Sequence, residues 1–223
     1  MSLIQRTRRP LSRDKQSFRD DRLFIIACDD TYAPKQYFDF FQLPRVQVQV
    51  IATQDGQSHA QFVLQRLKEI AFDEDDQRWM LLDTDHCTKK EHLPSYLQAL
   101  KEANEAGVQV ALSCPSFEFW LLLHHLDLAE IGELKNAKQV EDLLRNTLGT
   151  YNKTRLKAEH FPPSSLALAC RRAAALDNPS ETIPSINGSR VYLLWREIVQ
   201  AALPSQLSTE MQILRDMFVN FLA

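Results

Sequence analysis

The residues of this sequence best suited to chemistry are acidic side chains that follow short apolar runs. Asp83 and Asp85 end the run MLLDTDH, and Asp29 and Asp30 end the run LFIIACDD. Glu118 comes shortly after a third run, VQVALS. Residues two apart on a strand point to the same face, so the side chains of Asp83 and Asp85 can face one point if the strand continues.

Carboxylates gathered at one point repel one another unless a cation lies between them. Hard oxygen ligands with open coordination positions suit Mg²⁺ or Mn²⁺, and such ions support phosphoryl transfer. An aspartate after a strand also commonly caps a turn or a helix, so one Asp-x-Asp pair is weak evidence by itself. Acidic groups at three separate strand ends strengthen the metal interpretation.

Other reactive side chains have simpler explanations. His124 and His125 lie in an apolar helical segment and are best explained as core histidines. His86 and Cys87 adjoin the Asp-x-Asp pair, but no spacing of further ligands supports a softer metal there. Lys153, in the basic stretch YNKTRLK, belongs either to a solvated loop or to a phosphate contact near the acidic site.

Several familiar catalytic and nucleotide-binding motifs are missing. The sequence contains neither the GxxxxGK[ST] nor the GxGxxG cradle for phosphates, and it has no GxSxG elbow. The three tryptophans lie inside apolar patterns, where we expect core positions: Trp79, Trp120 and Trp195.

Length and composition are ordinary for a globular chain. The sequence has 223 residues, of which 44% are hydrophobic and 25% charged, which suffices for one well-buried domain. No apolar run approaches the roughly 20 residues that span a bilayer, and the charged start lacks the apolar core of a secretory signal. The four cysteines are widely spaced and form no CxxC pair. We therefore expect a cytoplasmic protein with reduced thiols, no zinc ribbon and no membrane partner.

The net charge of −3 is unevenly distributed. Residues 1–22 hold seven basic and three acidic residues, a net charge of +4, so the rest of the chain carries −7. We predict a mobile basic arm over residues 1–21. This arm is either a solvated tail or a segment that contacts nucleic acid phosphates.

Short apolar runs alternate with helical patterns in the first half of the chain. The runs at 23–28, 46–52, 78–83 and 108–113 predict strands, and amphipathic segments between them predict helices. This alternation is typical of right-handed βαβ units. We therefore predict an α/β fold with a small parallel sheet of about four strands flanked by helices. Functional groups of such sheets gather at the carboxyl ends of the strands, where the acidic residues stand.

The pattern changes after Ser113, where only helical segments follow. The segment SFEFWLLLHHLDL comes first, and four more helices are expected at 137–148, 163–177, 188–203 and 206–222. The predicted organisation is an α/β core over residues 22–130 and a C-terminal helical subdomain over residues 131–223.

The segment SCPSFEFWLLLHHLDL resembles the S-N-P-x-F-E-x-W-L-L-L-H-F segment of the RloB-like proteins, also called AbiLii. LLDTDH is similar to the family's F-D-x-D after a strand, and FIIACDDTYAPKQYF stands where the family has C-E-G-x-x-T-E-P-x-Y-F. YNK, LDNPS and SRVYLLWREI are similar to further family elements, Y-x-K, N-P-S and T-x-V-x-x-L-V. The resemblance covers residues 22–203, and its WLLLH segment is the most specific part.

This resemblance implies a TOPRIM-type core and a role in bacterial anti-phage defence beside a partner ATPase of the AAA or ABC type. TOPRIM sites bind Mg²⁺ through a Glu after the first strand and an Asp-x-Asp after a later one. From the resemblance we expect a Mg²⁺- or Mn²⁺-dependent nuclease acting on RNA, such as tRNA, or on DNA. Asp83 and Asp85 would hold the metal, and Asp29 would be a metal ligand or the acid/base group. Glu118 would either complete the carboxylate cluster or hold the metal-binding residues in place from behind, and Lys153 would contact a phosphate.

The segment after the first predicted strand departs from the family pattern. Where C-E-G is expected, the chain reads Cys28-Asp29-Asp30. Aspartate is one methylene shorter than glutamate, and a displacement of about 1 Å costs on the order of 10²-fold in rate. An alternative is therefore a catalytically degenerate TOPRIM scaffold that binds a partner ATPase or nucleic acid. A third is a structural or regulatory subunit whose acidic residues are only surface charge. The choice of RNA or DNA and the oligomeric state stay open.

Overall fold

A five-stranded sheet forms the centre of the molecule. The computed structural model describes residues 21–53, 56–85, 87, 91–184 and 186–221. The sheet has the order β2-β1-β3-β4-β5, and its strands are β1 (Arg22–Cys28), β2 (Val46–Ile51), β3 (Gln77–Asp83), β4 (Gln109–Cys114) and β5 (Gly188–Ser189). The first four strands are parallel, whereas β5 pairs antiparallel with the end of β4. The predicted α/β fold is confirmed.

The fifth strand is a departure from the sequence prediction. Gly188 and Ser189 were expected to begin a helix, but they pair with Cys114 and Ser113 instead. The hydroxyl oxygens of Ser189 and Ser113 lie 2.9 Å apart in a buried hydrogen bond. A two-residue strand carries no periodic pattern, so the sequence gives no signal for it.

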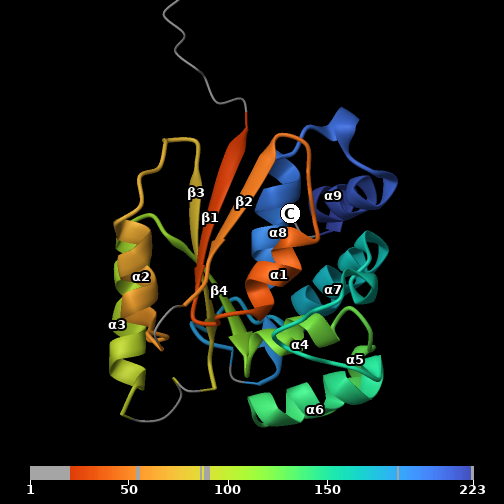
Figure 1. Ribbon diagram of the computed structural model, residues 1–223, viewed down its shortest axis with the longest axis horizontal. Coiled ribbons are helices and arrows are strands. Elements are labelled where there is room, and N and C mark those ends of the chain that lie inside the picture. Colours follow the sequence, from red (N-terminus) through yellow and green to blue (C-terminus); the bar gives the residue numbers. More distant parts are fainter. Residues whose placement is uncertain (1–20, 54–55, 86, 88–90, 185, 222–223) are drawn as a thin grey trace, which may run out of the picture.

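Two layers of helices cover the sheet. The helices α2 (Ala60–Lys68) and α3 (Leu93–Glu105) lie on one face, and α1 (Ala33–Asp39) and α4 (Phe117–Leu122) lie on the other (Figure 1). Strand β1 is buried on both faces, which explains its continuous apolar run. Strand β2 is at the edge of the sheet and alternates between exposed and partly buried residues.

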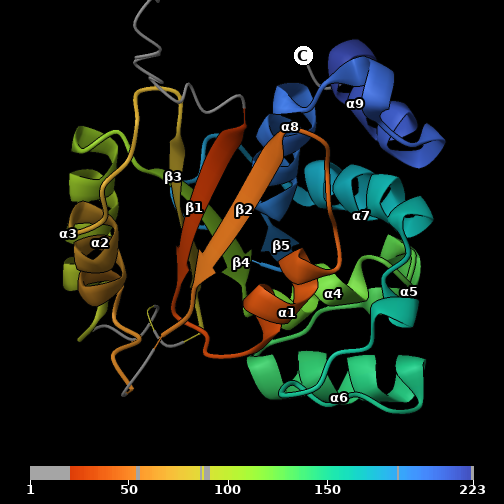
Figure 2. The same ribbon diagram turned by 45° about the horizontal axis from the view of Figure 1, so that its top comes forward.

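The C-terminal helices pack on the same side as α1 and α4 (Figure 2). They are α5 (Leu128–Ile131), α6 (Ala137–Leu148), α7 (Pro163–Leu176), α8 (Val191–Ala201) and α9 (Thr209–Phe221), with 3-10 turns at Ala158–His160 and Pro204–Gln206. Their buried side chains share one hydrophobic cluster with one face of the sheet. None of the described helices combines the length and hydropathy that crossing a bilayer requires.

The apolar helix after β4 is shorter than the sequence predicted. Helix α4 ends at Leu122, and Arg172 Nη1 donates a hydrogen bond to the Leu123 carbonyl, 2.7 Å away. Asp127 then starts α5 with a capping box that includes Glu130. The single helix predicted for this segment is therefore two helices. Arg172 bonds to the carbonyl after the first, and Asp127 caps the second.

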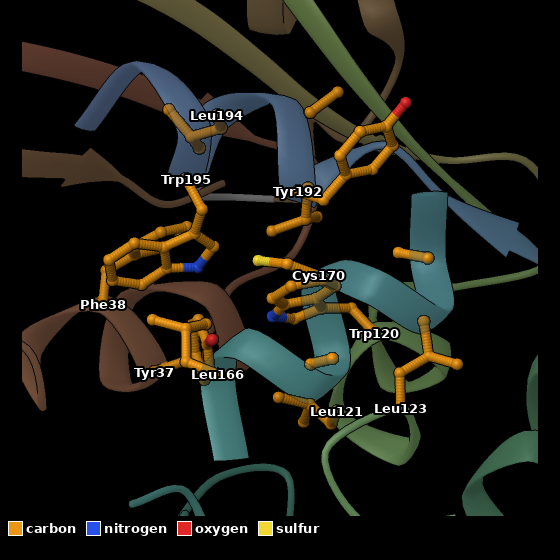
Figure 3. Packing of buried hydrophobic residues seen from close by; sticks show 14 of the residues in the cluster. Tyr37, Phe38, Trp120, Leu121, Leu123, Leu166, Cys170, Tyr192, Leu194 and Trp195 are labelled. Atoms are coloured by element: carbon orange, nitrogen blue, oxygen red, sulfur yellow. The ribbon is translucent and has the colours of Figure 1, made fainter. Parts of the chain in front are cut away.

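The core beside α1 is rich in aromatic side chains (Figure 3). Trp195 stacks on Phe38 with ring centroids 5.6 Å apart. His124 is buried, and its ring nitrogens lie 3.0 Å from the Tyr37 hydroxyl and 2.7 Å from Ser165 Oγ. The predicted core position of this histidine is confirmed. Core positions are also confirmed for the three tryptophans, which are all buried.

The predicted basic arm, residues 1–21, lies outside the described residues apart from Asp21.

Candidate active site

The carboxyl ends of β1 and β3 are neighbours, and they bring four aspartates together. In the register of the two strands, Cys28 is opposite Leu81. One carboxylate oxygen of Asp29 accepts a hydrogen bond from the Asp83 backbone N–H, with 2.8 Å between the heavy atoms. The aspartates line a pocket of about 600 Å³ at this edge of the sheet: Asp29, Asp30, Asp83 and Asp85.

Backbone hydrogen bonds fix Asp83 and Asp85 against the start of α4. Asp83 Oδ1 accepts a hydrogen bond from the Phe117 N–H, 2.8 Å away. The Asp85 N–H donates to the Pro115 carbonyl at 3.0 Å, so the chain runs on beside the end of β4 after β3 stops. The Asp-x-Asp pair therefore sits on a rigid support, and both of its side chains reach the pocket.

Burial and mutual repulsion raise the pKa values of two of these carboxyl groups. Burial, together with the charges of Asp30 and Asp85, raises the pKa of Asp29 to about 7, although a backbone N–H bond opposes the shift. Burial, followed by the charges of Asp29 and Glu118, also raises the pKa of Asp83. A cation between these groups would favour their charged forms and reverse the shifts.

Glu118 lies behind the pocket wall. It is 3% exposed and is not among the pocket's lining residues. Its oxygens accept hydrogen bonds from Ser116 Oγ at 2.7 Å and from the Tyr151 hydroxyl at 3.1 Å. Its carboxylate also lies 3.2 Å from Lys153 Nζ. Glu118 therefore does not reach the pocket itself. It contacts Lys153, which does line the pocket, and can fix the orientation of the Lys153 side chain.

Lys153 is the basic residue of the pocket wall. Its ammonium nitrogen lies 2.5 Å from Asp30 Oδ2 as well as close to Glu118. Burial acts to lower the pKa of Lys153, but the charges of Glu118 and Asp30 outweigh it and hold the pKa above its usual value. Lys153 is therefore charged at neutral pH and half-accessible from the pocket.

Sequence reasoning gave no role to several residues that build this site. Gln36 on α1 clamps the Lys153 segment, because its amide donates to the Lys153 carbonyl at 3.0 Å and accepts from the Leu156 N–H at 2.9 Å. Asp30 Oδ1 accepts from the Tyr32 N–H at 2.6 Å and so caps the start of α1. The Gln36 contacts join segments more than 100 residues apart, so no local pattern predicts them. The Asp30 contact is the turn or cap that the sequence offered as an alternative role for an aspartate after a strand.

Arg66 on α2 binds the chain segments at the carboxyl ends of β1 and β2, next to the pocket. Its guanidinium donates to the carbonyls of Ala52 at 3.0 Å and Cys28 at 3.2 Å, and to Thr53 Oγ1 at 2.9 Å. These acceptors stand at the carboxyl ends of β1 and β2. In sequence, Arg66 is one more polar residue of an amphipathic helix, and nothing singles it out.

The donor set suits a hard cation that keeps part of its water shell. Within the described residues, no group of three or more His, Cys, Asp and Glu side chains is arranged to hold a metal ion. Mg²⁺ is typically held by one or two carboxylates together with water and substrate phosphates. Asp83 and Asp85, which both line the pocket, could supply these one or two carboxylates. Cys87 also lines the pocket, but burial raises its pKa to about 12 and keeps it a thiol, and His86 lies outside the described residues.

Comparison with known proteins identifies the family. The profile of the RloB-like protein family matches residues 24–198, well over half of the chain. The chain therefore belongs to the RloB-like protein family. A search of curated proteins and a search of solved structures each found no match.

Proposed function

We propose that this protein is a Mg²⁺- or Mn²⁺-dependent nuclease that cleaves phosphodiester bonds in nucleic acid, with tRNA among the candidate substrates. One observation carries the proposal. Asp29, Asp83 and Asp85 line a single pocket at adjoining strand ends, where burial and the charges of neighbouring carboxylates raise the pKa values of Asp29 and Asp83. Perturbed carboxyl groups in a cleft are typical of functional sites.

In the proposed nuclease, the residues in and beside the pocket have different roles. Asp83 and Asp85 would hold the metal ion, which would stabilise the negative charge that develops on the phosphate oxygens. Asp29 lines the pocket beside Asp83, so it would either accept a proton or join the metal ligands. Lys153 contacts a phosphate oxygen from the pocket wall. Glu118 keeps the Lys153 ammonium group in place.

The biological setting is part of the proposal. The RloB-like family resemblance supports a role in bacterial anti-phage defence, with a partner ATPase of the AAA or ABC type. Pulldown of this protein with the product of a neighbouring ATPase gene, with and without nucleotide, would test that partnership. Absence of any complex under both conditions would remove the ATPase from the proposal.

The test of the proposed activity is cleavage of end-labelled tRNA, single-stranded DNA and duplex DNA with Mg²⁺ or Mn²⁺. The Asp83→Asn, Asp85→Asn double variant should lose cleavage while keeping its fold. The matched control is Asp39→Asn, which makes the same chemical change at an exposed site on α1. Equal cleavage by the wild type and the double variant would remove the assignment of these residues.

A second candidate function is a degenerate scaffold that binds a partner ATPase or nucleic acid without cleaving it. The observation that favours it is the short Asp29 where the family has glutamate. In addition, the described residues include no group of three or more His, Cys, Asp and Glu side chains arranged to hold a metal ion. A thermal melt separates the two candidates, because a metal that binds only the folded state raises the melting temperature. A melting temperature that is independent of Mg²⁺ and Mn²⁺ would favour the scaffold.

A further inference from the structure

Exposed aromatic rings border the mouth of the acidic pocket. Tyr32, just before α1, is 48% exposed, and Phe62 on α2 is 46% exposed. His59 and His92 immediately precede α2 and α3, and both are exposed. Tyr32, His59 and His92 also line the pocket. The rings of Tyr32, His59 and His92 are therefore accessible to a ligand bound in the pocket.

These rings form two groups on opposite sides of the strand ends. The His59 ring centroid lies 5.8 Å from that of His92 and 6.3 Å from that of Phe62, so these three form one group. Tyr32 belongs to the other side, because α1 covers the opposite face of the sheet from α2 and α3 (Figure 1). The pocket that holds the carboxylates is lined by Tyr32 from one side and by His59 and His92 from the other.

The charge of the pocket argues against recognition through the phosphate backbone alone. Of the charged lining residues that the structure describes, Lys153 is opposed by four aspartates. Proteins that track duplex phosphates use a surplus of positive charge. Proteins that bind single strands draw much of their affinity from bases stacked on aromatic side chains, about 5- to 150-fold per base.

We infer that the two aromatic groups stack on bases at either side of the phosphate that reaches the carboxylates, and that the substrate is therefore single-stranded nucleic acid. In a duplex each base face is already covered by its neighbour, whereas neighbouring bases of an unpaired strand are free to separate. This inference rests on the proposed nuclease function, because the site of the phosphate is taken from it.

The test is fluorescence anisotropy with the full chain and labelled oligonucleotides of about 12 nucleotides, a length that covers one typical single-strand site. Ca²⁺ replaces Mg²⁺ so that binding is read without cleavage. The probes are a single strand of RNA or DNA, the matching duplex, and the same strand with abasic sites. Tyr32→Ala and His59→Ala are the variants, and Tyr32→Phe keeps the ring.

The matched control is Phe72→Ala. Phe72 is 47% exposed, but it packs against the Arg78 guanidinium at 3.8 Å, beside the amino-terminal end of β3 and away from the pocket. This variant removes an exposed ring without touching the proposed surface.

We expect the wild type to bind the single strand more tightly than the duplex or the abasic strand. Tyr32→Ala should weaken single-strand binding at least about fivefold, while Tyr32→Phe and Phe72→Ala stay within about twofold of the wild type. Unchanged binding by Tyr32→Ala and His59→Ala would overturn the inference, as would a wild type that binds no single strand. The cleavage assay is separate, so cleavage with no effect of Tyr32→Ala removes only this inference. Ring-dependent binding without cleavage removes only the nuclease.

Discussion

The Asp29→Asn substitution should stabilise the metal-free protein at alkaline pH. The raised pKa of Asp29 means that folding disfavours its charged form. Between the usual pKa of 3.8 and about 7, the native state binds more protons than the unfolded state, so stability falls as pH rises through this window. Asparagine cannot ionise, and its carbonyl oxygen can still accept the hydrogen bond from the Asp83 N–H.

The magnitude follows from the size of the shift. One pKa unit corresponds to about 1.4 kcal/mol, so a shift of this size corresponds to about 4 kcal/mol in the free energy of unfolding above pH 7. Asp29 borders the pocket and is only partly shielded from water, which makes this an upper value. We expect a gain of about 1–4 kcal/mol for Asp29→Asn at pH 8 and almost none at pH 4, where the wild-type carboxyl is already neutral.

Urea denaturation at both pH values, with a chelator present, measures this difference. Asp39→Asn is the control, because its exposed side chain should give no gain that depends on pH. Adding Mg²⁺ at pH 8 should then raise the stability of the wild type more than that of Asp29→Asn. An Asp29→Asn variant no more stable than the wild type at pH 8 would refute the idea that this carboxyl group is strained by burial and neighbouring charge.

Three further substitutions test other parts of the site and core. Lys153→Met leaves Glu118 without its cation and should lower the free energy of unfolding by about 1–3 kcal/mol at pH 7, as measured by urea denaturation; an unchanged value would contradict a structural ion pair. Arg66→Met removes the hydrogen bonds from the guanidinium to the Ala52 and Cys28 carbonyls and should cost about 1–3 kcal/mol, read as a lower denaturation midpoint beside the exposed control Lys35→Met. Burial lowers the pKa of His124 to about 3, so its stabilising effect is present above pH 6.5 and is lost as pH falls toward 3. Thermal melts of His124→Asn should therefore decline less between pH 7 and pH 4 than those of the wild type, and equal slopes would count against the buried neutral imidazole.

The sheet was largely predictable because its strands are short and continuous in the sequence. Strands β1 and β3 are buried on both faces, and their uninterrupted apolar runs end at the acidic residues that line the pocket. The rule that functional groups gather at the carboxyl ends of parallel strands then places Asp29 and Asp83 together. Local pattern and fold class suffice for this part of the site.

The rest of the site depends on contacts between distant segments. The Lys153 ammonium group meets Glu118 only because the segment after α6 returns to α1, where Gln36 bonds to it across 117 residues of sequence. The tyrosine that bonds to Glu118, Tyr151, is likewise 33 residues from its partner. Such pairings are set by tertiary packing and leave no periodic trace in either segment.

The most direct test of the account is Mn²⁺ binding, followed by electron paramagnetic resonance, because it needs neither a substrate nor a partner ATPase. We expect the wild type to bind Mn²⁺ at pH 7.5 and Mg²⁺ to compete for the site. The Asp83→Asn, Asp85→Asn double variant should bind at least about tenfold more weakly, while Asp39→Asn binds as the wild type does. Equal Mn²⁺ binding by the wild type and the double variant, or none by either, would contradict a metal centre at the ends of β1 and β3.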